Sequence, residues 1–271
     1  MRIFYCGDVV GRSGRDAVLS RLPDLRQRLA LDFVVVNGEN AAHGFGITGK
    51  MCDEFFDAGA DVITLGNHSW DQREILSYID SEPRLIRPLN YPAGTPGRGA
   101  GIYAAGQGRK IMVVQVMGRL FMDPLDDPFR QMEAELVRHP LAASVQAILI
   151  DVHAEATSEK MALGYVADGR ASLVVGSHSH VPTADVRIMP GGTAYQSDAG
   201  MCGDYDSVIG MKKDTAVARF VRKIPGERLS PAEGEGTLCG LFVETDDRTG
   251  LAVRAEPVRM GGALAPTVFP G

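Results

Sequence analysis

The sequence predicts a layered α/β fold. Short runs of β-branched and other apolar residues recur through the first two thirds of the chain, and most end in polar, glycine-containing turns. Helix-like stretches alternate with the early runs. Strands that alternate with helices are typical of a sheet covered by helices, and this order therefore favours an α/β architecture.

The apolar runs are too short for helices and are predicted to be buried strands. They span residues 1–6, 33–36, 62–65, 111–116, 147–150 and 173–175. Helices are predicted where apolar residues recur at helical spacing, at 16–29, 49–58, 72–79 and 130–138. Pro23 interrupts the pattern of the first helix, and His139-Pro140 ends the last one.

The remaining segments differ in character. Residues 83–108 are rich in proline and glycine, and we expect long loops there with one short strand at 101–105. Residues 238–244 and 251–260 predict an antiparallel strand pair joined by a turn at 246–250. The sequence contains no repeat, linker or low-complexity tract, which predicts a single domain over residues 1–271.

Composition excludes several classes of protein. The 271 residues are 45% hydrophobic, enough for a sizeable core, and the net charge of -6 argues against a stable complex with nucleic acid. No run of roughly 20 apolar residues predicts a membrane span. The four cysteines lack disulfide-type spacing, and no leader-like segment precedes the first strand, so we expect a cytoplasmic protein. Whether it forms a homo-oligomer is left open.

Rare polar residues gather just after the apolar runs. Four of the six histidines lie at such positions. The set comprises Asp8, Glu39, Asn40, Asn67, His68, His153, His178 and His180. Ligands of open α/β sheets bind outside the carboxyl ends of the strands, which would bring these side chains together.

Each position also has a structural interpretation. Asp8 could belong to an ordinary turn, Asn67 could cap a helix near Ser69, and His153 could be a buried, hydrogen-bonded histidine. These interpretations do not explain why all the residues share one kind of location. Carboxylate, amide and imidazole together favour iron, manganese or zinc over calcium. In an extended segment, His178 and His180 would point the same way, toward neighbouring ions.

The order of these motifs resembles the calcineurin-like metallophosphoesterases. The motifs are Gly7-Asp8, Gly38-Glu39-Asn40, Gly66-Asn67-His68, Val152-His153 and Gly176-Ser177-His178-Ser179-His180. Two departures stand out: Val10 replaces the family's histidine in the first motif, and Glu39 replaces its bridging aspartate. We suggest that Asn40 supplies the ligand that Val10 cannot.

The same departures resemble a narrower group, the YmdB-like branch. The matching stretches are GDVVGRSGR, VNGENAAHGFGIT, GNHSWD, DVHAEATSEK and GSHSHVPTAD. This resemblance implies a four-layer α/β/β/α sandwich, two iron or manganese ions, and phosphodiesterase or phosphatase activity. The implied substrates are small phosphorylated nucleotides, including 2′,3′-cyclic nucleotides.

Carried over to this sequence, the resemblance assigns two sets of ligands. The first ion would be held by Asp8, Glu39, Asn40 and His180. The second would be held by Glu39, Asn67, His153 and His178. His68 would be the general acid that protonates the leaving oxygen, a role that suits a group titrating near neutral pH.

Other functions fit the sequence less well. Gly7, Gly11 and Gly14 suggest a phosphate-binding turn, but they do not form G-x-G-x-x-G. His153-Ala154-Glu155 matches the first half of a zinc deaminase motif, but no P-C-x-x-C follows. A regulator that binds metal or nucleotide with slow turnover stays open.

The two histidines outside the set are assigned separately. His139 is expected to be structural or solvated. His43 lies in the loop that follows Glu39 and is a candidate for substrate contact.

Overall fold

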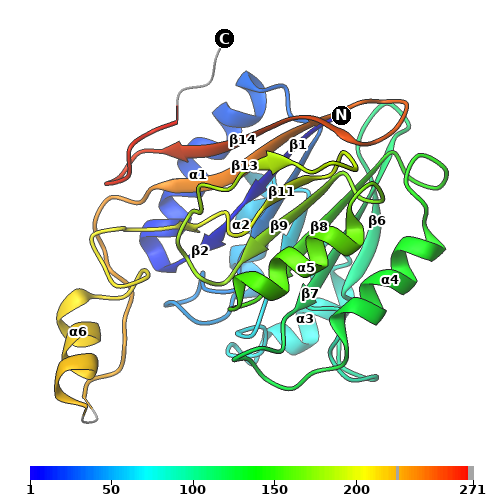
Figure 1. Cartoon of the computed structure of the whole chain (residues 1–271). Helices are drawn as coiled ribbons and strands as arrows, with labels where there is room; N and C mark the ends of the chain where they lie inside the picture. Colours follow the sequence, from blue (N-terminus) through cyan, green and yellow to red (C-terminus); the bar gives the residue numbers. More distant parts are fainter. Residues whose placement is uncertain (224–225, 268–271) are drawn as a thin grey trace.

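The computed structural model describes residues 1–223 and 226–267, which build two six-stranded sheets stacked face to face (Figure 1). The first has the order β14-β13-β1-β3-β4-β5, in which β1, β3, β4 and β5 are parallel. Its strands are β1 (Arg2–Cys6), β3 (Phe33–Asn37), β4 (Val62–Thr64), β5 (Leu85–Ile86), β13 (Leu238–Thr245) and β14 (Ala252–Met260).

The second sheet has the order β10-β11-β9-β8-β7-β6, with β7, β8, β9 and β11 parallel. Its strands are β6 (Ala100–Ala104), β7 (Lys110–Met117), β8 (Ala147–His153), β9 (Leu173–Ser177), β10 (Arg187–Ile188) and β11 (Ala194–Gln196). A small pair, β2 (Asp8–Val9) and β12 (Met201–Cys202), lies beyond the end of β1.

Helices cover the outer face of each sheet. The first sheet packs against α1 (Gly11–Arg28), α2 (Gly49–Asp57) and α3 (Ile75–Ser81), and the second against α4 (Pro128–Arg138) and α5 (Thr157–Ala167). Buried side chains accordingly form three separate layers. Phe4 packs toward α1, Ile3 and Tyr5 pack between the sheets, and Val114 packs toward α4 and α5. The predicted α/β/β/α sandwich is confirmed.

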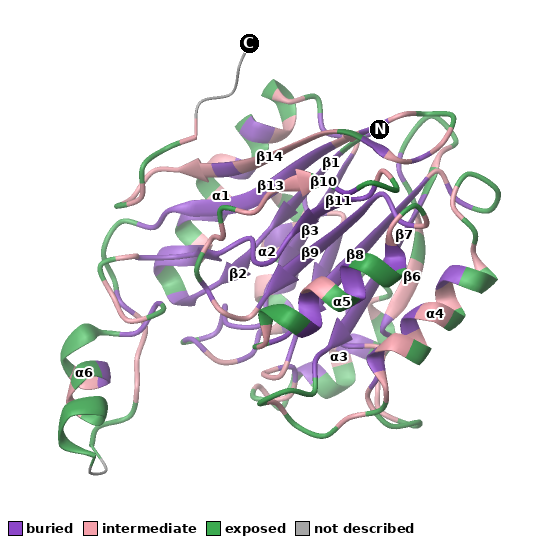
Figure 2. Ribbon diagram, in the orientation of Figure 1, coloured by how far each residue is buried: buried purple, intermediate pink, exposed green. Residues whose placement is uncertain are grey.

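Burial explains why the central strands read as continuous apolar runs. Every residue of β3, β8 and β9 is buried, because each strand has a helix layer on one face and the opposite sheet on the other. Figure 2 shows this inner block of buried strands, with exposed residues on the outer faces of the helices, on the loops and on the edge strands β6 and β14.

Several predicted boundaries need correction. The first helix begins at Gly11 rather than Asp16, and Pro23 lies on its exposed face, where solvent can satisfy the carbonyl that proline leaves unused. The third begins at Ile75, so Asn67 does not cap it. Helices α5 and α6 (Lys213–Arg222) had no sequence prediction. That the chain forms one domain stays a prediction.

Helix α6 differs from the others because it extends away from the sandwich (Figure 1). Only Ala216 among its residues is buried. Within the described part of the chain, the helices are all too short or too polar to span a membrane.

Candidate metal centre

The predicted polar residues converge at the carboxyl ends of the parallel strands. Asp8 follows β1, Glu39 and Asn40 follow β3, and Asn67 and His68 follow β4. From the second sheet, His153 is the last residue of β8, and His178 and His180 follow β9. Because the two sheets are stacked, both sets of strand ends face one site.

His153 lies at the centre of this cluster and is fully buried. Its Nε2 atom is 2.9 Å from Asn67 Oδ1, 3.1 Å from Glu39 Oε1 and 3.1 Å from His178 Nδ1. Its Nδ1 atom is 2.9 Å from Ser177 Oγ, which fixes the orientation of the ring. The ring nitrogen that faces the cluster is therefore surrounded by the other predicted ligands.

Two groups of side chains have the geometry to hold an ion. One consists of Glu39, His153 and His178, and the other of Asp8, Glu39 and His180, with donor atoms within 4.8 Å of one another in each group. Glu39 belongs to both groups. This arrangement is what a carboxylate that bridges two cations requires.

Asn40 adds an unusual feature. Its Nδ2 donates to Gly44 O at 3.0 Å, but its Oδ1 is buried and has no hydrogen-bond partner among the described residues. Burying an unpaired acceptor is costly, and such groups in native proteins are normally satisfied by a partner, water or ion. The orphaned oxygen is therefore suited to a cation.

The buried carboxylates and histidines of the cluster shift one another's pKa values. Burial raises the pKa of the Asp8 carboxyl to about 7, although His180 and His153 oppose the shift. Burial also acts to raise the pKa of Glu39, but His153 and His68 outweigh it and hold that pKa at about 2. Burial acts to lower the pKa of His153, whereas Glu39 and Asp8 raise it to about 9. The buried carboxylates of Glu39 and Asp8 thus favour positive charge beside them.

His68 occupies a different position from Asn67, although the two are adjacent in sequence. The His68 backbone amide donates to Glu39 Oε2 at 3.1 Å, while its ring turns outward and its Nδ1 is 2.8 Å from Asp71 Oδ2. The ring edge packs against Phe45, with centroids 5.1 Å apart. His68 also lines the hollow beside the cluster.

The sequence reasoning missed the side chains that support this site. Ser177 Oγ donates to Asp151 Oδ1 at 2.7 Å, and Gln115 Nε2 donates to the other Asp151 oxygen at 3.0 Å. Asp151 and Gln115 therefore support the His153 ring indirectly, through Ser177. Asp71 supports His68 directly, through its contact with Nδ1. Asp151 precedes His153 by two residues on a strand, and that alternation was an available signal.

The physical reason given for pairing His178 with His180 was wrong. Strand β9 ends at Ser177, and both histidines have positive φ, 93° and 64°, rather than extended backbone. They consequently enter different groups of the cluster. His180 Nδ1 donates to Ile209 O at 2.8 Å, which turns its Nε2 toward Asp8 and Glu39.

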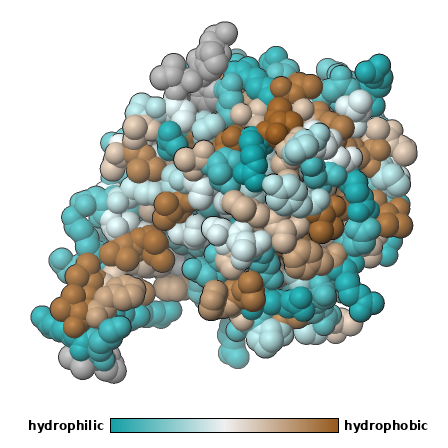
Figure 3. Space-filling model, in the orientation of Figure 1, coloured by the Kyte–Doolittle hydropathy of each residue, from teal (hydrophilic) through white to brown (hydrophobic). Residues whose placement is uncertain are grey.

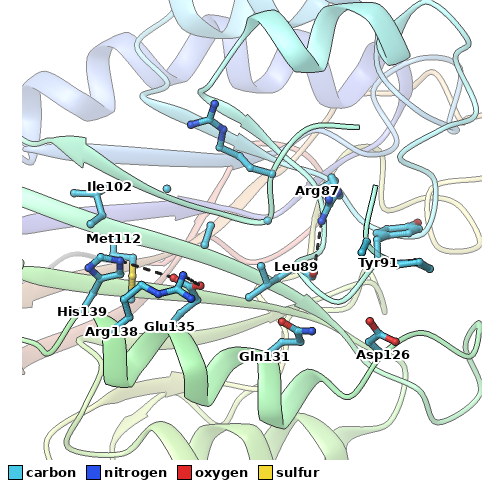
Figure 4. Close-up of a pocket in the computed structure, with 16 residues that line it drawn as sticks. Arg87, Leu89, Tyr91, Ile102, Met112, Asp126, Gln131, Glu135, Arg138 and His139 are labelled. Atoms are coloured by element: carbon cyan, nitrogen blue, oxygen red, sulfur yellow. Dashed lines mark hydrogen bonds and ion pairs between the residues drawn. The ribbon is translucent and has the colours of Figure 1, made fainter. Parts of the chain in front are cut away.

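The other two histidines lie outside the cluster. His43 is exposed, and the hollow beside the cluster is not lined by it. His139 lines a separate hollow of about 610 Å³ between β6, β7 and α4, where it faces Glu135 at 4.0 Å (Figure 4). Arg87 in that hollow is buried and donates to the carbonyls of Pro88, Thr95 and Pro96, so it organises the 87–98 loop.

Two stacked sheets with a buried carboxylate, amide and histidine cluster at their strand ends define a calcineurin-like metallophosphoesterase. Within this class, the chain belongs to the YmdB-like protein family, whose model matches residues 4–258. Both the predicted family and the predicted enzyme class are thereby confirmed.

Relatives match over nearly the full chain. A 2′,3′-cyclic-nucleotide 2′-phosphodiesterase of Bacillus subtilis (strain 168) is 48% identical, over 95% of this chain and 96% of the relative. The crystal structure of a hypothetical protein from Thermus thermophilus has a TM-score of 0.89 and 44% identity, covering 96% of this chain and 99% of that one. A novel phosphatase from Mycoplasma pneumoniae has the same TM-score and 31% identity, covering 96% and 93%.

Proposed function

We propose that this chain hydrolyses 2′,3′-cyclic nucleotides with two metal ions, and that it cleaves the bond between phosphorus and the 2′ oxygen. The observation that carries the proposal is Glu39, whose carboxylate belongs to both candidate ion groups at the strand ends. The Bacillus subtilis relative, named for this reaction, supports the choice of substrate.

The donor set fits two ions. We assign Asp8, Glu39, Asn40 and His180 to one ion and Glu39, Asn67, His153 and His178 to the other. Mixed oxygen and nitrogen donors without cysteine favour iron or manganese. Three observations support the fit: Asn40 Oδ1 has no hydrogen-bond partner in the described part of the chain, the carboxylates of Asp8 and Glu39 are buried together, and Gly66 leaves no room for a side chain against Glu39 and His153.

The bound ions would supply charge neutralisation for the phosphate and an activated water at neutral pH. The chain's own residues then orient the reaction. The oxygen of a water molecule forms a bond to phosphorus and gives up one proton to solvent. The bond from phosphorus to the 2′ oxygen breaks, and His68 gives its proton to that oxygen and regains one from solvent. Asp71 holds His68 in place through Nδ1, which leaves Nε2 to donate. The product is a nucleoside 3′-monophosphate.

The role of His68 is tested by changing the leaving group. His68→Ala should retain both ions and lose roughly 10²–10⁴-fold in turnover of 2′,3′-cyclic nucleotides, whose sugar oxygen is a poor leaving group. The loss should shrink for a nitrophenyl phosphodiester, because nitrophenolate departs without a proton. Turnover by stopped assay and metal content by elemental analysis are the two measurements.

His139→Ala is the matched control. His139 lies in the separate hollow beside α4, so this variant should keep the metal content and turnover of the unaltered protein. An equal loss on both kinds of substrate, or loss of an ion from His68→Ala, would contradict the general-acid assignment. A protein that binds metal and nucleotide but turns over neither substrate would be a regulator instead.

A further inference from the structure

The cluster opens into a hollow with two unlike walls. The hollow has a volume of about 500 Å³, and its polar wall includes Glu39, His68, His178 and His180. The remaining lining is mostly apolar, and this apolar wall includes Phe45, Ile209, Met211 and Phe220. A phosphate needs only the polar wall, so the apolar wall remains unexplained by the reaction itself.

Helix α6 supplies part of the apolar wall in an exposed position. Phe220 is 69% exposed although it is a large aromatic residue, and Val217 and Val221 on the same helix are also exposed. Figure 3 shows hydrophobic side chains gathered over this projecting part of the molecule. An exposed aromatic ring at the rim of a candidate active site has an open face for a planar ligand.

The chemistry of a cyclic nucleotide decides on which side its base must lie. Both ester oxygens of the cyclic phosphate belong to one ribose, so the nucleoside stays with the leaving oxygen. That oxygen must approach His68, which lines this hollow. The base is therefore directed into the hollow with the apolar wall.

A second hollow beside the cluster fits less well. It is lined by Asn67, Phe121, Met122, Asp123 and His178, with a volume of about 360 Å³. Phe121 there is 89% exposed and could also stack on a base. His68 does not line this hollow, however, and Asp123 would repel a nucleotide phosphate placed beside it.

We propose that Phe220 and Phe45 form a nucleobase subsite, in which the base of a cyclic nucleotide packs against the apolar wall while its phosphate lies on the cluster. The proposal rests on the proposed function. Stacking does not read the hydrogen-bonding edge of a base, because every base has an aromatic face. Purine and pyrimidine substrates should both be accepted, with the larger purines bound more tightly.

The test compares substrates with and without a base. Phe220→Ala should raise KM for 2′,3′-cyclic AMP by about tenfold, as loss of one stacking contact predicts, with little change in kcat. Its KM for methyl riboside 2′,3′-cyclic phosphate, which has the same leaving oxygen and no base, should not change. Phe121→Ala is the matched control and should leave KM for both substrates unaltered.

Direct binding separates this proposal from the proposed function. Calorimetric titration should show tighter binding of adenosine 3′-monophosphate than of ribose 3-phosphate, and Phe220→Ala should remove the difference. If the unaltered protein hydrolyses neither cyclic substrate, the proposed function fails. The difference in binding between the two monophosphates still tests whether the nucleobase subsite exists. Equal effects of Phe220→Ala on both substrates, or the same KM change in Phe121→Ala, would overturn the subsite.

Discussion

Glu39 is the residue on which both candidate ion groups depend. One carboxylate oxygen faces His153 Nε2 at 3.1 Å, and the other accepts the amide of His68 at 3.1 Å. Glu39→Gln keeps the size of the side chain and removes its charge. We predict a loss of turnover of more than about 100-fold, since altering even a supporting residue of a metal site costs roughly 10–100-fold. Bound metal should fall as well.

Glu133→Gln on the exposed face of α4 is the control for the same chemical change. Metal content by elemental analysis and turnover by a phosphodiester assay should both be normal in it. If Glu39→Gln kept a full complement of metal and near-normal turnover, Glu39 would not bridge two ions.

Asn40 offers a more selective prediction at the same scale. Its Oδ1, which has no hydrogen-bond partner among the described residues, is proposed to replace the histidine ligand that Val10 cannot supply. Asn40→Ala should therefore weaken the ion held with Asp8 and His180 more than the ion held with His153. Metal titration should show one site weakened and the other nearly unchanged. Equal weakening of both sites would contradict the assignment of Asn40 to one ion.

At the scale of the elements, the turn after β4 packs tightly against the cluster. A Cβ atom on Gly66 would overlap Glu39 Oε2 and His153 Nε2. Gly66→Ala should displace both side chains and reduce turnover by about 100-fold, because small misplacements of catalytic groups cost that much. Gly203→Ala is the control, since its added Cβ would meet neighbours only at 3.5 Å or more.

Circular dichroism and thermal unfolding should show both glycine variants folded, and metal content should fall only in Gly66→Ala. Normal metal binding and turnover in Gly66→Ala would show that the turn has more freedom than its contacts indicate.

At the scale of the whole molecule, one buried ion pair joins a helix layer to the site. Lys160 on α5 donates to Ser177 O at 2.7 Å and to Asp198 Oδ2 at 2.8 Å, and both charged side chains are 1% exposed. Asp198 also accepts the amide of Ser179, which precedes His180, and the amide of Gly200. The pair therefore positions the loop that carries two of the proposed ligands.

Lys160→Met should leave the Asp198 carboxylate buried without its cation. Breaking such a pair costs about 3–5 kcal/mol, which corresponds to a fall in Tm of roughly 10 °C for a chain of this size. Arg170→Met breaks the partly exposed pair with Glu133 and should cost no more than about 1 kcal/mol. Thermal unfolding compares the two variants, and equal shifts in Tm would contradict the special role of Lys160.

Much of the fold was predictable because a strand that is buried on both faces has a continuous run of apolar residues in the sequence. The runs at 33–36, 147–150 and 173–175 are apolar throughout, and each corresponds to a strand between a helix layer and the other sheet. Helix α6 was missed although Ala216, Val217, Phe220 and Val221 recur at helical spacing, and only Ala216 of this helix is buried. Residues 83–108 were predicted to be mainly loops, but the sequence did not indicate that Arg87 would organise them through hydrogen bonds to their carbonyls.

The sequence by itself determined which side chains gather at the site. Each of them lies at or just after the carboxyl end of a strand. Parallel strands bring these ends to one edge, so chain order alone brings Asp8, Glu39 and His153 together. The ligand roles of these residues stay predictions.

Only the tertiary structure decided how those side chains are oriented and what surrounds them. His178 and His180 enter different groups because both have positive φ, which no periodicity in the sequence specifies. Asp151 supports His153 through Ser177, and Phe220 reaches the rim of the hollow from a helix far along the chain. Such contacts join residues distant in sequence, and their formation depends on the packing of whole layers rather than on any local pattern.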